Sequence, residues 1–164
     1  MRGSQPAEIM KHSPNQTAER SGALFEQGLC CAESVLQAVA ESCDIRSDLI
    51  PRIATGFCAG VSRSGGICGA VSGGVMAIGL VTGRSCAGES REENHRLTRM
   101  FLSEFESTFG STNCEQLVGC RLDTPEGQKC FNEHNLRQKC AGFTQESARM
   151  VSSALEKSLS ARPH

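Results

Sequence analysis

The sequence predicts an all-α protein, a single-domain bundle of five or six helices around a buried glycine-rich helix. Apolar residues recur at helical spacing in several segments, and no segment shows a convincing period-2 strand pattern. Residues 56–83 hold nine of the 17 glycines and a single charge, Arg63. Small residues recur four apart in this stretch, which puts them on one helix face where a neighbouring backbone can approach closely.

Length and composition suit one domain with its own core. Of 164 residues 38% are hydrophobic, and Trp and Tyr are absent, so the core must use aliphatic, small and Phe side chains. The net charge of −1, without a long basic run, gives no indication of nucleic-acid binding. The apolar run 66–83 is too rich in Gly, Ser and Ala for a membrane span, and no signal peptide is recognisable.

Six helices and one short helical piece are expected, at residues 17–27, 31–43, 47–57, 69–81, 89–109, 113–119 and 144–159. Residues 1–16 are polar, contain two prolines and show little periodicity. This composition predicts a disordered N-terminal arm, followed by a cysteine-rich helical domain over 17–160.

End signals and apolar stripes define the first three helices. Gly28 is expected to end the first helix. The second carries an i, i+3, i+4, i+7, i+11 stripe, which indicates one buried face. This stripe consists of Ala32, Val35, Leu36, Val39 and Cys43. Pro51 falls in the first turn of the third helix, where proline is tolerated.

The glycine-rich helix follows a turn at Ser64-Gly65-Gly66, which places Cys68 at the helix start. Free backbone N–H groups and the positive end of the helix dipole lie there. A thiol in this position ionises more easily, and the thiolate is the form that attacks disulfides or binds metal.

The later part of the chain contains the strongest amphipathic pattern, over 89–109. Its apolar side chains recur every four residues, at Leu97, Phe101, Phe105 and Phe109. Gly110 follows this pattern and is expected to end the helix, because glycine is common just after the last helical residue. The polar residues 121–138 are expected to be irregular, with room for one helical turn. Thr144 can cap the last helix.

The ten cysteines are the compositional anomaly. Without a recognisable signal peptide a cytoplasmic setting is expected, where many cysteines are metal ligands or redox thiols. Four fall at or just before an expected helix start, namely Cys31, Cys68, Cys114 and Cys140. If these starts converge, positive dipole ends would surround a pocket of thiols suited to thiolate chemistry or to a metal–sulfur cluster.

Several standard cysteine and metal motifs are absent. There is no Cys-x-x-Cys pair, which argues against a thioredoxin-like site and a zinc ribbon, and no haem-attachment motif. Glu92 and His95 match half of a di-iron motif, but a single copy favours a solvated helix start. Cys130 and His134 lie four apart and could share a metal on a helix, although a surface histidine is the favoured interpretation.

These residues resemble the C-GCAxxG-C-C family of redox-active proteins of bacteria and archaea. Four places carry the resemblance, namely Cys31-Ala32, the glycine block 65–74, the segment 109–114 that ends in Cys114, and Cys140. The resemblance spans about 17–159 and implies an all-α fold and a redox role for the four cysteines. It extends to the non-haem part of split-Soret cytochromes, which implies an iron–sulfur centre, whereas haem is not expected because the chain lacks the attachment motifs. Cys120 and Cys130 compete for the third and fourth family positions.

The leading hypothesis is a cytoplasmic redox protein, either a thiol oxidoreductase or an electron carrier with an unidentified redox partner protein. Cys68 would be the central catalytic thiolate, with Cys31 as the second catalytic thiol. Cys114 and Cys140 would join them as resolving thiols or as fellow ligands of an iron–sulfur cluster.

Three alternatives remain open. The chain could be a non-catalytic helical scaffold whose cysteines pack in the core. It could be an exported protein with five disulfides, which the even cysteine count allows. Finally, the glycine-rich face could serve a homodimer as well as the internal core.

Overall fold

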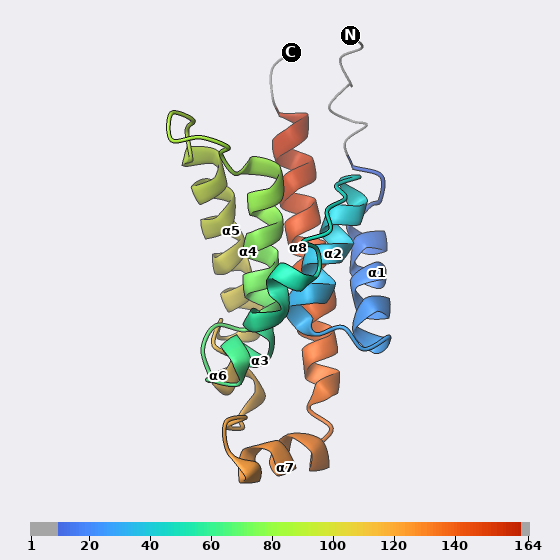
Figure 1. The fold of residues 1–164 in the computed structure, drawn as a ribbon, viewed down its shortest axis with the longest axis vertical. Helices are drawn as coiled ribbons and strands as arrows, with labels where there is room; N and C mark the ends of the chain where they lie inside the picture. The colour runs from blue at the N-terminus through green and yellow to red at the C-terminus, as the bar shows by residue number, and fades with distance from the viewer. Residues whose placement is uncertain (1–9, 162–164) are drawn as a thin grey trace.

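The computed structural model describes residues 10–161, which form a bundle of helices (Figure 1). The elements are α1 Pro14–Glu26, α2 Cys31–Ser42, the 3₁₀ helix η2 Arg52–Phe57, α3 Cys58–Ser62, α4 Gly69–Thr82, α5 Glu92–Phe109, α6 Cys114–Val118, α7 Pro125–Glu133 and α8 Arg137–Ser160. Over 10–161 the only β pairing is an isolated bridge between Ile67 and Asn113. The all-α class predicted from the sequence is therefore confirmed.

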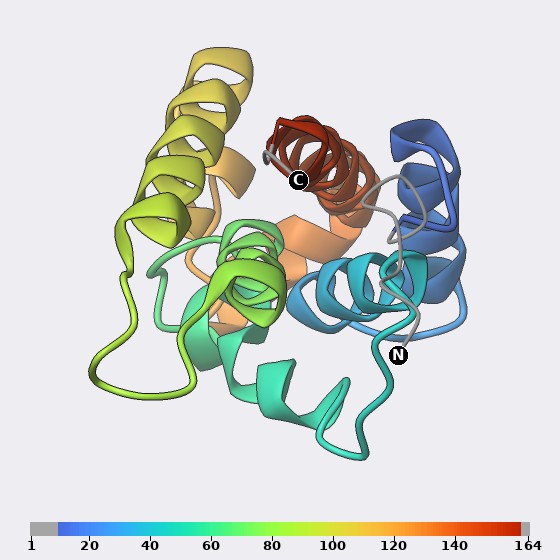
Figure 2. The ribbon, with the colours of Figure 1, turned by 90° about the horizontal axis from the view of Figure 1, so that it is seen from above.

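The long helices α1, α2, α4, α5 and α8 pack side by side (Figure 2). Helix α8 contacts the other four, and α4 packs against α2, α5 and α8. A Cβ atom on Gly73 would lie 2.6 Å from the carbonyl oxygen of Ala32, and one on Gly74 would lie 2.6 Å from the ring of Phe101. The small residues of α4 therefore let α2 and α5 pack closely against α4 within this chain.

The start of α1 differs from the expected boundary. Residues 1–9 of the expected arm lie outside the described range. A capping box between Ser13 and Gln16 starts the helix at Pro14, three residues earlier than expected. Met10 packs against the core, so residues from 10 onward belong to the folded domain.

The helix expected over 47–57 is shorter, a 3₁₀ helix that begins at Arg52. Where residues 121–138 were expected to be irregular, α7 forms. The Thr124 side chain accepts a hydrogen bond from the Gly127 N–H, and Pro125 is the first helical residue. This cap and proline outweigh the polar composition of the segment.

Helix α8 begins at Arg137, seven residues before the expected start. Thr144 therefore does not cap it. The Thr144 side chain is buried, and its hydroxyl donates to the Cys140 carbonyl oxygen at 2.7 Å. The extra turns bring Cys140 inside the helix and toward the other cysteines.

A left-handed turn connects η2 to α4 by way of α3. The five residues Ala59 to Arg63 all have positive φ, between 53° and 70°. Left-handed backbone costs a non-glycine residue about 1–2 kcal/mol, and it persists where surrounding contacts hold it. A Cβ atom on Gly60 would lie 2.5 Å from the Cys114 Cβ, so the turn packs directly on the start of α6.

Candidate functional site

Six cysteines line one cavity of about 300 Å³, namely Cys30, Cys31, Cys58, Cys68, Cys114 and Cys140. The cavity lies at the end of the bundle where α3, α6 and α7 gather, the lower end in Figure 1. Cys31 and Cys114 are the first residues of α2 and α6, and Cys68 is the N-cap of α4. Cys140 lies in the first turn of α8. The structure thus brings the four helix-start cysteines to one place.

Backbone hydrogen bonds fix the relative positions of two of these helix starts. The Cys68 N–H donates to the Thr112 carbonyl oxygen, and the Cys114 N–H donates to the Gly66 carbonyl oxygen, each at 2.8 Å. The Asn113 side-chain amide donates to the Gly65 carbonyl oxygen at 2.6 Å. The glycine turn before α4 and the cap of α6 therefore form one rigid connection between Cys68 and Cys114.

The Cys31 thiol lies where a thiolate is best stabilised. A hydrogen bond from the Cys140 side chain is the largest influence, and it lowers the pKa of Cys31 against the opposing effect of burial. The N–H groups of Cys31 and Ala59 lower it further. The Thr144 hydroxyl also lies beside Cys31, but we assign it a minor part because its proton is donated to the Cys140 carbonyl.

The other three thiols of this set favour the neutral form. Cys68 is 4% exposed, and burial raises its pKa to about 12. Burial likewise raises the pKa of Cys114 to about 11. The hydrogen bond to Cys31, followed by burial, raises the pKa of Cys140. The helix-start argument predicted easy ionisation for Cys68, and this fails because desolvation of the thiolate exceeds the effect of the helix dipole.

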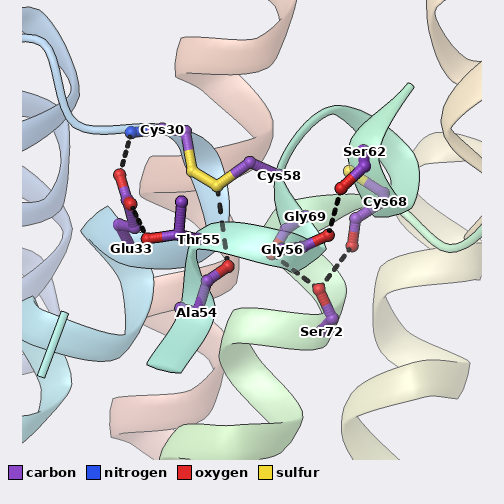
Figure 3. Close-up of a disulfide and its surroundings, with 10 residues drawn as sticks. All are labelled: Cys30, Glu33, Ala54, Thr55, Gly56, Cys58, Ser62, Cys68, Gly69 and Ser72. Carbon is purple, nitrogen blue, oxygen red and sulfur yellow. Dashed lines mark hydrogen bonds between the residues drawn. A yellow bond between two sulfur atoms is a disulfide. The ribbon is translucent and has the colours of Figure 1, made fainter. Parts of the chain in front are cut away.

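Cys30 and Cys58 form a disulfide at the wall of the cavity (Figure 3), with their Cα atoms 5.8 Å apart. The Glu33 carboxylate accepts hydrogen bonds from the Cys30 N–H at 2.9 Å and from the Thr55 hydroxyl at 2.5 Å. The disulfide and these hydrogen bonds join the start of α2 to η2 and the left-handed turn. Sequence reasoning missed this pair, since its separation of 28 residues matches no motif.

The other described cysteines, eight in all, are unpaired, so the structure does not have the five-disulfide arrangement. Cys120 is buried and Cys130 half-buried in a cluster with Cys114 and Cys140, but neither lines the cavity. Helix α7 brings the Cys130 sulfur to 3.8 Å from Nδ1 of His134. Cys86 lies exposed in the loop before α5.

Metal-ligand geometry separates single-ion sites from cluster sites. Within residues 10–161, three potential ligand atoms lie within 4.8 Å of one another only at Cys30, Glu33 and Cys58, whose two sulfurs are joined in the disulfide. Four sulfurs around one zinc ion, with bonds of about 2.3 Å, would be roughly 3.8 Å apart. The four helix-start cysteines are more widely spread than such a site requires. Their donor type and number match those of an iron–sulfur cluster, in which thiolates bind different irons.

Apolar side chains, including Phe25, Phe131 and Phe143, form much of the remaining cavity wall. Arg63 and Arg137 are the charged residues that line it. The sequence carried no signal for these two arginines, because they come from the left-handed turn and from a helix start that were not predicted.

In the part of the chain that the structure describes, no helix combines the length and apolar character needed to cross a bilayer. A family model described as "Putative redox-active protein (C_GCAxxG_C_C)" matches residues 29–154. The matched region contains all six cavity cysteines. No curated protein and no solved structure matches the chain.

Proposed function

The chain belongs to the C_GCAxxG_C_C family of redox-active proteins, and from this premise we propose that it reduces disulfides with Cys31 as nucleophile and Cys140 as resolving thiol. One observation carries the proposal. Cys31 and Cys140, from α2 and α8, line the same cavity, and hydrogen bonding by the Cys140 side chain is the main influence that lowers the pKa of Cys31. A thiolate with a second thiol in contact is the arrangement that dithiol chemistry needs.

The reaction begins with attack of the Cys31 thiolate on one sulfur of a substrate disulfide. The substrate's S–S bond breaks, the departing sulfur takes up a proton from solvent, and Cys31 is left in a mixed disulfide. Cys31 then no longer accepts a hydrogen bond as a thiolate, so the main cause of the raised Cys140 pKa disappears. Cys140 loses its proton to solvent and attacks the Cys31 sulfur.

This second attack releases the remaining half of the substrate as a thiol and forms a Cys31–Cys140 disulfide. The substrate gains two electrons and two protons, and the Cys31–Cys140 dithiol loses them. A reducing dithiol from a redox partner protein would return the pair to its starting state. Because Cys68 and Cys114 stay neutral near pH 7, they do not compete with Cys31 for the substrate.

Native thiol kinetics test this assignment. Reduced protein would be mixed with a small aromatic disulfide, the released thiol followed by absorbance, and the products mapped by mass spectrometry. We expect a fast phase that Cys31→Ser removes and a Cys31–Cys140 crosslink in the wild type. Cys86→Ser is the matched control, since Cys86 is exposed and does not line the cavity. A fast phase that survives in Cys31→Ser would contradict the proposal, and uniformly slow thiols would support a packing scaffold.

A second candidate function is electron transfer through an iron–sulfur cluster. The observation that favours it is the spread of four thiols around one cavity, wider than a single ion needs. Cys31, Cys68, Cys114 and Cys140 would hold the cluster, which when bound would supply one-electron transfer. Anaerobic purification followed by a visible spectrum and iron and sulfide analysis distinguishes the two candidates. Stoichiometric iron and sulfide that are lost in Cys68→Ser would favour the cluster.

We further propose that the protein works in the cytoplasm. The eight unpaired thiols suit a reducing compartment better than an oxidising one, where neighbouring thiols such as Cys31 and Cys140 would tend to pair. Alkylation of thiols in intact cells, before lysis, would show Cys31 and Cys140 reduced if this holds. A quantitative Cys31–Cys140 disulfide in untreated cells would contradict it.

A further inference from the structure

The two charged residues that line the cysteine cavity are both positive, while Glu33 and Glu115 lie behind its wall at Cys30 and Cys114. Arg63 and Arg137 line it, and no Asp or Glu of the described residues does. Helices α2 and α4 begin at the same cavity, so the positive ends of their dipoles add to the field of the arginines. A substrate in this cavity can therefore contact two positive side chains and no negative one.

Arg137 is held in place by two contacts with Phe25. Its guanidinium lies 4.1 Å from the centre of the Phe25 ring, and its Nη2 donates to the Phe25 carbonyl oxygen at 2.8 Å. Neither contact neutralises the charge, and no carboxylate in residues 10–161 forms an ion pair with it. A guanidinium has five N–H donors in a fixed fork, so donors remain for a carboxylate.

Arg63 reaches the cavity from the left-handed turn. Its φ is 70°, and its N–H donates to the Ala59 carbonyl oxygen at 3.0 Å, so the backbone at this position is fixed by the turn. Its side chain is exposed, and among the described residues it has no ion-pair partner. The turn therefore presents a second positive charge at the cavity, in addition to Arg137.

The size of the cavity sets the size of the substrate. A volume of about 300 Å³ is at the lower end of small-ligand sites, which typically measure about 300–1,000 Å³. The apolar wall formed by Phe25, Phe131 and Phe143 suits the carbon and sulfur atoms of a small disulfide.

We propose that the substrate is a low-molecular-weight disulfide that carries carboxylates, and that Arg63 and Arg137 select it over neutral and cationic disulfides. This inference rests on the proposed function and adds a substrate class to it. Chemically, the anionic disulfide is reduced to two thiol-carboxylates while the Cys31–Cys140 dithiol becomes a disulfide. The two arginines act as positioning residues that bind the carboxylates and take no part in the bond changes.

Three symmetric disulfides of similar size and different charge test the inference, namely dithiodiglycolate, bis(2-hydroxyethyl) disulfide and cystamine. Reduced full-length protein would be mixed anaerobically with each, and the rate of Cys31–Cys140 crosslinking would be divided by the rate for a free small thiol. We expect the normalised rate for the anionic compound to exceed that for the cationic one by about tenfold or more at low ionic strength. In about 1 M salt, where the Debye length is about 3 Å, most of this preference should be lost.

Charge variants locate the effect. Arg63→Gln and Arg137→Gln should each reduce the anion preference several-fold, and Arg63→Glu should bring the cationic disulfide level with or above the anionic one. Arg99→Gln, an equal charge change at an exposed position of α5 outside the cavity, should keep the wild-type preference. Arg63→Gln should leave folding intact because the exposed Arg63 side chain makes no ion pair among the described residues, so it keeps the test informative if Arg137→Gln is unstable.

The outcomes separate the two proposals. Equal normalised rates for all three disulfides, or a preference that survives in both glutamine variants, would overturn the substrate class and leave the dithiol function standing. Failure of all three disulfides to crosslink Cys31 to Cys140 would overturn the dithiol function and the substrate class together.

Discussion

At the scale of single residues, one hydrogen bond shifts two pKa values in opposite directions. The Cys140 side chain stabilises the Cys31 thiolate, and the same contact makes Cys140 harder to ionise. The four cysteines are therefore chemically unequal, although all were grouped by their positions at helix starts. The inequality comes from contacts and burial at each sulfur.

Replacement of Cys140 tests this hydrogen bond. Cys140→Ala removes the donor, so the pKa of Cys31 should rise and its alkylation at neutral pH should slow in proportion to the lost thiolate. Cys140→Ser keeps an O–H donor and should keep the pKa of Cys31 low. Alkylation rates of Cys31, measured against pH by mass spectrometry, give the midpoints. Identical midpoints in the two variants would contradict the assignment.

Burial of Cys68 links stability to alkaline pH. Its folded-state pKa of about 12 lies above the ordinary value of 9.0 for an exposed thiol. The unfolded chain therefore releases this proton first as pH rises, so the stability contribution is complete below about pH 9 and is lost between there and about pH 12. The free energy of unfolding should fall by about 1 kcal/mol per pH unit from this thiol in that window.

Urea unfolding at pH 8 and pH 10 measures this loss. Cys68→Val removes the titrating group and should show a smaller fall in stability than the wild type, whatever its starting stability. Cys86→Ser, which changes an exposed thiol, should show the wild-type fall. The idea fails if the Val variant loses as much stability as the wild type between the two pH values.

At the scale of elements, α4 depends on glycine at particular positions rather than along its whole length. Gly73 lies against the backbone of α2 at Ala32, whereas a Cβ atom on Gly79 would meet no atom within 4 Å. Gly73→Ala should destabilise the protein by about 1–3 kcal/mol through overpacking against rigid backbone. Gly79→Ala should be neutral or stabilising by up to about 1 kcal/mol through helix propensity. Thermal and urea unfolding of both variants would show whether they differ in this direction.

The left-handed turn and the C-cap of α5 supply a second matched pair of glycines. Gly60 and Gly110 both have positive φ, but only Gly60 packs against a neighbour, the Cys114 Cβ. Ala at either position has the backbone cost of about 1–2 kcal/mol. Gly60→Ala should in addition displace Cys114 and the turn that carries Arg63. We therefore expect Gly60→Ala, and not Gly110→Ala, to alter the rate of Cys31–Cys140 crosslinking; equal crosslinking rates would show that the turn does not shape the site.

At the scale of the whole molecule, the Cys30–Cys58 disulfide joins the bundle to the segment that closes the cavity. It spans 28 residues, for which loop-closure entropy gives about 3–4 kcal/mol of stabilisation. The double variant Cys30→Ala, Cys58→Ala should unfold at lower temperature than the oxidised wild type by an amount consistent with this figure. Wild type with this disulfide selectively reduced should resemble the variant. If reduction leaves the unfolding temperature unchanged, the disulfide is not a structural crosslink.

Much of the fold follows from local sequence patterns. The all-α class, the boundaries of α2 and α4, the end of α5 and the short α6 each depend on apolar spacing and end signals within a few residues, whereas α5 begins at Glu92, three residues after its expected start. The grouping of Cys31, Cys68, Cys114 and Cys140 also came from local positions at helix starts. The polar segment 121–138 was expected to hold one helical turn at most, and α7 is longer because the Thr124 cap and Pro125 start a regular helix despite the polar composition.

The sequence by itself determined the all-α class, the helices with clear apolar stripes, and the positions of Cys31, Cys68 and Cys114 at helix starts, because backbone hydrogen bonds and side-chain periodicity act over short separations. Only the tertiary structure decided that Cys140 in α8 touches Cys31 in α2, that Cys30 pairs with Cys58, and that Cys68 is too buried to ionise easily. These properties depend on which helices pack together and on how much water reaches each sulfur. Both are set by the packing of the complete bundle and cannot be found in any one segment of it.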